Sequence, residues 1–145
     1  QGINYLTSSV VTIEGTESRD FATIQGEHID EYLAHHPDPT RARVSQGLVV
    51  IPTDRATPEQ VRKYEAYAES RLARTRTPQG PRGMLFSPDY VGPSDQLAER
   101  LYAHTGFQRA GEVAFALPFS FDESDYIQIV TDIAERLGPA LGWPR

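Results

Sequence analysis

Three side chains that could bind a metal ion or move a proton share one face of a helix predicted over residues 27–36. His28, Glu31 and His35 are spaced at i, i+3 and i+7, and both imidazole and carboxylate groups bind zinc. This spacing differs from zinc motifs such as His-Glu-x-x-His, so we predict no metal site. His28 and Glu31 are instead candidates for a general base, and the alternative is a solvated polar face.

A second stretch with a distinct pattern is a predicted helix, glycine and strand from Ser94 to Leu117. Ser94 is a favourable N-cap, and Gly106 can end the helix because a left-handed conformation costs glycine little. Residues 113–117 alternate between large apolar and small residues, which is typical of a strand. The apolar face of the helix is formed by Leu97, Ala98, Leu101 and Tyr102.

An apolar strand and a strongly capped helix precede this stretch. Residues 44–51 contain the run GLVVI, which favours a strand buried on both faces. Thr57 is predicted to cap the following helix, with Pro58 at its first position and Gln60 completing a capping box. This helix is expected to run to about Arg74.

The stretch from Ser94 to Leu117 resembles the end of the GCN5-related N-acetyltransferase (GNAT) family. That family reads Asn-x-x-Ala-x-x-Leu-Tyr-x-x-x-Gly-Phe, followed after a short spacer by Gly-Glu. The strand, turn and helix from Gly47 onward also have the family's layout, so the resemblance covers about residues 47–117. The matching residues are Asp95 (in place of Asn), Ala98, Leu101, Tyr102, Gly106, Phe107, Gly111 and Glu112.

The resemblance implies an acyl-CoA-dependent N-acyltransferase with acetyl-CoA as cofactor and a small-molecule or protein amine as acceptor. The implied fold is α/β, a GNAT-like mixed sheet flanked by helices in a single-layer sandwich. Tyr102 would be the general acid that protonates the departing thiolate; its alternative role is that of a core tyrosine. The residues implied to bind the cofactor are Leu48, Val49, Val50, Arg55, Thr57, Gln60, Val61 and Asp95.

The turn that would hold the cofactor's pyrophosphate departs from the family pattern, Arg/Gln-x-x-Gly-x-Gly/Ala. The corresponding residues from Arg55 to Val61 include no glycine. Pro58 lacks an N–H donor, and Glu59 places a negative charge beside the anion. We expect these changes to weaken cofactor binding roughly 10- to 1,000-fold. The alternative is therefore a non-catalytic α/β interaction module or structural subunit of a larger assembly.

Two further readings stay open. The end of the chain is similar to the C-terminal lobe of a pyridoxal-phosphate enzyme, although the chain's single lysine, Lys63, lies mid-helix. Four arginines at the end of the helix from Thr57 could bind an anion or could be a solvated helix end. They are Arg71, Arg74, Arg76 and Arg82.

The remaining elements are predicted from local pattern. Strands are expected over residues 8–14, 21–24 and 84–87. A last helix is expected over residues 123–137, capped by Asp122 and ended by Gly138 and Pro139. Its expected buried side consists of Tyr126, Ile127, Val130, Ile133 and Leu137. Trp143 is expected to pack back on the body or to mark a partner interface.

Length and composition bound the class of protein. The 145 residues predict one domain, with residues 138–145 as a tail and residues 1–2 interpreted as a tag remnant or trimmed end. The net charge of −6 argues against nucleic-acid or membrane partners, and a homo-oligomer or protein assembly is allowed. The absence of cysteine fits a cytoplasmic location.

Overall fold

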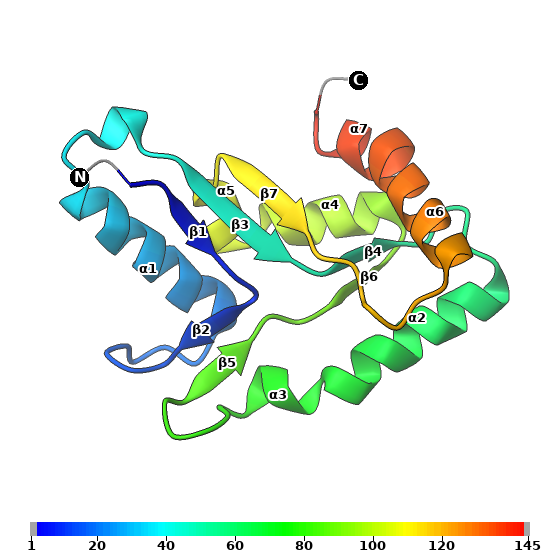
Figure 1. The fold of residues 1–145 in the computed structure, drawn as a ribbon, viewed down its shortest axis with the longest axis horizontal. Coiled ribbons are helices and arrows are strands. Elements are labelled where there is room, and N and C mark those ends of the chain that lie inside the picture. Colours follow the sequence, from blue (N-terminus) through cyan, green and yellow to red (C-terminus); the bar gives the residue numbers. More distant parts are fainter. Residues whose placement is uncertain (1–2, 144–145) are drawn as a thin grey trace.

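The computed structural model describes residues 3–143 as helices around three small sheets (Figure 1). The predicted α/β class, with helices flanking mixed strands, is confirmed. The strands are β1 (Tyr5–Thr7), β2 (Val10–Thr12), β3 (Val44–Leu48), β4 (Val50–Pro52), β5 (Met84–Phe86), β6 (Tyr90–Gly92) and β7 (Glu112–Phe115). The helices are α1 (Phe21–His35), η1 (Pro39–Arg41), α2 (Pro58–Arg71), α3 (Ala73–Arg76), α4 (Ser94–Tyr102), α5 (Thr105–Arg109), α6 (Glu123–Asp132), η2 (Ile133–Leu137) and α7 (Gly138–Ala140).

The segment formed by β3 and β4 is central, because it takes part in two of the sheets. β3 pairs in parallel with β1 and β7, with Tyr5 opposite Val44 and Ser45 opposite Glu112. After Val49 the chain continues as β4, which pairs in parallel with β6. The third sheet joins β2 to β5 in antiparallel orientation.

The two faces of this central segment pack into different clusters. Leu48 and Val50 are fully buried in the larger cluster, under residues of α1, α4 and η2. Val49 and Ile51 point the other way, into a smaller cluster with α2 and α6. Beside β3 that second face is less covered, since Leu6 is 68% exposed and Ala114 is also exposed.

Helices α1 and α5 pack closely because glycines lie at their contact. A Cβ on Gly26 would come within 2.7 Å of Thr105. A Cβ on Gly106 would overlap Oε1 of Gln25, which accepts a hydrogen bond from the buried Gln46 amide. Gly106 was expected to end a helix, but it lies inside α5. Its lack of a side chain therefore has a packing reason.

The N-terminal predictions need correction. The strand expected over residues 8–14 is found only as the shorter β2, and β1, which precedes that range, was missed. The strand expected over residues 21–24 is instead the first turn of α1, because the Asp20 carboxylate accepts a hydrogen bond from the Thr23 N–H at 2.8 Å and caps the helix. Phe21 and Ile24 are buried by this helix.

The predicted buried side of the last helix was also partly wrong. Ile127 and Val130 are 61% and 51% exposed, whereas Ile129 and two aspartates, Asp125 and Asp132, are buried. The Gly138–Pro139 pair does not end the helical path, since α6 passes through the π-helix η2 into the short α7.

None of the helices within residues 3–143 has both the length and the apolar character that crossing a membrane would require.

Candidate functional site

The predicted cofactor turn is occupied by the chain's own groups. The capping box is confirmed, because the Gln60 N–H donates to Thr57 Oγ1 at 3.2 Å and the Thr57 N–H donates to Gln60 Oε1 at 3.0 Å. The Val61 N–H bonds within the helix to the Thr57 carbonyl. The Arg55 N–H donates to the Asp132 carboxylate at 2.9 Å. Pro58 has no N–H to offer.

Asp132 stands where an anion would have to enter. Its side chain is fully buried, and Oδ2 also accepts a hydrogen bond from Gln128 at 2.6 Å. The other oxygen, Oδ1, has no hydrogen-bond partner and lies 3.9 Å from the Arg55 guanidinium, which also pairs with Glu135. A diphosphate would meet the buried Asp132 carboxylate at this helix end. Removing that carboxylate would leave the Arg55 N–H and the Gln128 amide without this acceptor.

A second buried carboxylate ties α6 to the same end of α2. Asp125 accepts hydrogen bonds from Lys63, Gln60 and the Tyr64 hydroxyl. Burial alone would raise the pKa of the Asp125 carboxyl, but the hydrogen bonds from Lys63, the Asp122 N–H and Gln60 hold it below its usual value. Burial also raises the pKa of the Tyr64 hydroxyl. This network holds α6 against the N-terminal part of α2.

The strand residues implied to bind the cofactor, Leu48 to Val50, are already paired in the sheets. The Ala116 N–H donates to the Leu48 carbonyl at 2.8 Å, and the Tyr90 N–H donates to the Val49 carbonyl at 2.9 Å. Leu48 and Val50 are fully buried. β4 and β6 run side by side here rather than separating. The remaining cofactor residue, Asp95, is exposed in the first turn of α4 and accepts a hydrogen bond from the neighbouring Gln96 N–H.

The predicted general bases lie on the outer side of α1. Glu31 is exposed, and its carboxylate lies 3.3 Å from Nδ1 of His35, whose side chain is 74% exposed. His28 is partly buried on the same helix. In residues 3–143, no group of three or more histidine, aspartate or glutamate side chains is arranged to hold a metal ion. Two of the four arginines interact with the chain's own groups: Arg71 pairs with Asp89, and Arg74 stacks on Phe86.

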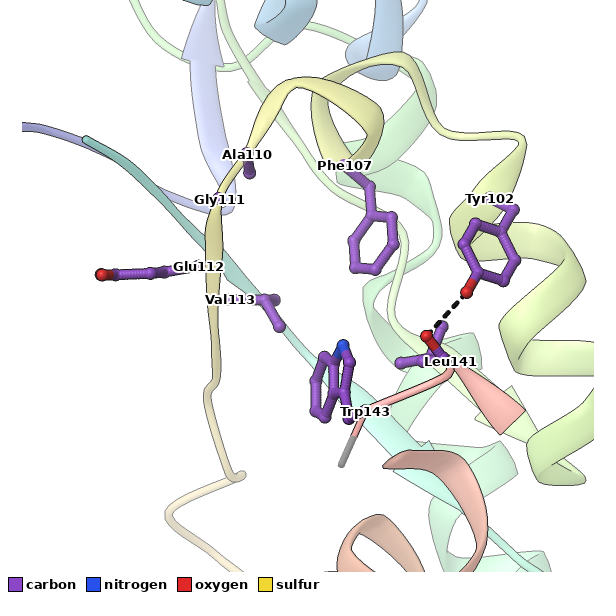
Figure 2. Close-up of a pocket in the computed structure, with 8 residues that line it drawn as sticks. All are labelled: Tyr102, Phe107, Ala110, Gly111, Glu112, Val113, Leu141 and Trp143. Atoms are coloured by element: carbon purple, nitrogen blue, oxygen red, sulfur yellow. Dashed lines mark hydrogen bonds between the residues drawn. The ribbon is translucent and has the colours of Figure 1, made fainter. Parts of the chain in front are cut away.

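An aromatic-walled groove lies between α4, α5, β7 and the C-terminal segment (Figure 2). Its volume is about 400 Å³, and we call it the aromatic groove. In Figure 2 the side chains of Val113 and Phe107 point into it, while the Glu112 side chain points away. The lining residues are Tyr102, Phe107, Ala110, Gly111, Glu112, Val113, Leu141 and Trp143.

Tyr102 belongs to this groove and not to the predicted cofactor turn. Its ring is half-exposed, and its hydroxyl donates a hydrogen bond to the Leu141 carbonyl at 2.7 Å. The predicted cofactor residues are absent from the groove lining. The structure thus does not bring the predicted general acid into one site with them.

Trp143 forms the opposite wall. Its indole stacks on Phe115 at 5.9 Å between ring centroids, and 38% of the residue is exposed. Its backbone N–H donates to the Gly138 carbonyl at 2.9 Å, which holds the segment against the body. The expectation that Trp143 packs back is confirmed. Sequence reasoning missed the groove itself, because Phe107 and Phe115 lie far from Trp143 in the chain.

Comparisons with protein-family models, curated proteins and solved structures find no match to this chain.

Proposed function

We propose that the protein is a non-catalytic interaction module that holds an apolar side chain of a protein partner in the aromatic groove. The observation that carries this proposal is the contrast between two places. The predicted cofactor turn is filled by Asp132 and the capping box, whereas the aromatic groove is open and walled by Trp143, Phe107 and Tyr102. Exposed aromatic walls around a concavity are the usual anchor of a protein interface.

The chemistry of the groove favours binding over catalysis. The Tyr102 hydroxyl is committed to the Leu141 carbonyl, and the walls otherwise consist mainly of ring and methyl carbons. The Glu112 carboxylate points away from the interior and accepts a hydrogen bond from Ser45 at 2.8 Å. A nucleophile or general base facing a bound group is therefore lacking among these lining residues.

A thermal melt separates this proposal from the acyltransferase prediction. Acetyl-CoA at 100 times its dissociation constant would stabilise a binding protein by about 2.7 kcal/mol. We expect an unchanged melting temperature with millimolar acetyl-CoA. A dose-dependent rise would return the acyl-CoA-dependent function to first place, and a Tyr102→Phe variant would then test the general acid.

Groove binding can be followed through the chain's single tryptophan. N-acetyl-phenylalanine amide and N-acetyl-leucine amide, titrated into the protein, should produce a saturable change in Trp143 fluorescence. Ala110→Phe should abolish the change by filling the groove, whereas Ala34→Phe, on the exposed side of α1, should not. A linear, non-saturating response in the wild-type protein would contradict the proposal.

A further inference from the structure

Strand β7 has hydrogen-bonding groups available beside the groove. Within the described chain, its only ladder partner is β3. The Ala116 N–H points to β3, where it bonds to Leu48, and the N–H and C=O of successive residues in a strand point to opposite sides. The N–H and C=O groups of Val113 and Phe115 therefore point away from β3, toward the free edge.

This edge lacks the usual features that prevent strand addition. Lysine, proline and inward-pointing charges commonly protect exposed edges. Residues 112–115 read Glu-Val-Ala-Phe, with no lysine or proline. The one charge, on Glu112, lies on the opposite side of the strand from the aromatic groove (Figure 2). An added strand would meet no repulsive group on the groove side.

One extended segment could pair with the free edge of β7 and place a side chain in the aromatic groove. Side chains of neighbouring strands lie in register and alternate between faces. A residue paired beside Val113 would project into the aromatic groove, toward Trp143. The next residue would project to the other face, beside the exposed Glu112 carboxylate.

We propose that the partner is an extended peptide segment that adds as a strand to the free edge of β7, with an apolar side chain in the aromatic groove and a basic side chain beside Glu112. This rests on the proposed function and adds the form and charge of the partner. Backbone hydrogen bonds would supply affinity and the groove would select the side chain, as in other cases of strand addition. The net charge of −6 also favours a basic segment.

The test uses an acetylated and amidated hexapeptide in which lysine alternates with phenylalanine, titrated while Trp143 fluorescence is recorded.

Val113→Pro removes an outward N–H but leaves the β3 ladder and a three-carbon side chain in place. Val113→Thr keeps both the N–H and the shape, and serves as the matched control. We expect at least a tenfold weaker affinity for Val113→Pro and less than a threefold change for Val113→Thr.

N-methylation of the hexapeptide gives an independent readout. Because alternate amides of an added strand face β7, methylating every second residue should abolish binding, and methylating the others should not. Glu112→Gln should weaken binding about two- to fivefold, with a smaller difference at high salt.

Each contrary result has a distinct meaning. Binding that is lost in Ala110→Phe but unchanged in Val113→Pro would overturn strand addition and leave the groove function standing. Failure of the hexapeptide to bind, while the single amino-acid amides do bind, would also overturn strand addition alone. Wild-type protein that is dimeric by sedimentation, with Val113→Pro monomeric, would assign the edge to a second copy of the chain and overturn the peptide proposal.

Discussion

Replacing Gly106 with alanine tests whether this glycine is fixed by packing alone. The added methyl group would overlap Oε1 of Gln25 and lie 3.1 Å from Nε2 of Gln46. Both glutamines are fully buried, so neither can move into solvent. The substitution must therefore separate α5 from α1 or break the hydrogen bond between the two amides.

The expected cost follows from these two effects. Overpacking a dense core costs about 1–3 kcal/mol, and leaving a buried amide unsatisfied costs about 1–3 kcal/mol. The gain from replacing glycine with alanine in the unfolded state offsets roughly 0.4–1 kcal/mol. Where both costs act, these ranges give a net loss of about 1–5.6 kcal/mol, which corresponds to a melting temperature lower by roughly 3–17 °C.

Urea unfolding followed by circular dichroism measures this loss, with Gly111→Ala as the matched control. A Cβ on Gly111 would have its nearest neighbour, the Val44 carbonyl oxygen, at 4.0 Å, so that variant should differ from wild type by less than about 1 kcal/mol. Equal stability of the two variants would refute the packing explanation for Gly106. Gly106→Ala should cost less in a Gln25→Ala background than in the wild-type protein, because the overlapping oxygen is then absent.

The remaining predictions concern buried polar groups and pH. The pKa of Asp125 is lower in the folded protein than in the unfolded chain, so its stabilising contribution is present above about pH 4 and is lost as pH falls through the folded pKa. The unfolding free energy of Asp125→Asn should therefore fall less steeply than that of the wild type below pH 4. Equal slopes for the two proteins would contradict the hydrogen-bond network around Asp125. Burial lowers the pKa of His104, whose Nδ1 accepts the Phe107 N–H at 3.1 Å, so the unfolded chain takes up a proton first as pH falls. The unfolding free energy should decline from about pH 7 downward, by at most ~1.4 kcal/mol per pH unit. His104→Asn, which can keep the helix cap, should lack this decline in urea titrations at pH 7.5 and 5.5. An identical pH dependence of the variant and the wild type would contradict this role of His104. Asp132→Ala should cost about 3–5 kcal/mol because it strands the Arg55 N–H and the Gln128 amide, and a loss below 1 kcal/mol on thermal unfolding would show that the carboxylate does not hold the turn closed.

Features set by neighbouring residues could be predicted from the sequence. The capping box of α2 was correct because Thr57, Pro58 and Gln60 act within one helical turn. The α/β class was correct because strands and helices alternate in the chain. The start of α1 was missed because the β-branched and aromatic pattern outweighed Asp20, whose capping role depends on geometry.

Features set by distant residues could not be predicted. The buried side of α6 includes Asp125 and Asp132, and both carboxylates accept hydrogen bonds from residues 55–63, which are distant in the chain. The aromatic groove joins Tyr102 to Leu141 and Phe115 to Trp143, and no local pattern connects these residues. Strand β6 was missed because three residues after Pro88 give too short a pattern, and its pairing with β4 is what defines it.

The break at Val49 fixes the register of β3 and β4 against their neighbouring strands. Residues before it are held by β1 and β7, and residues after it are held by β6. Sliding the whole segment by one residue would turn Leu48 and Val50 toward the smaller cluster and Val49 and Ile51 toward the larger one. Because both ladders would have to slip together, insertions or deletions between Val44 and Pro52 should be tolerated far less than changes in the surrounding loops.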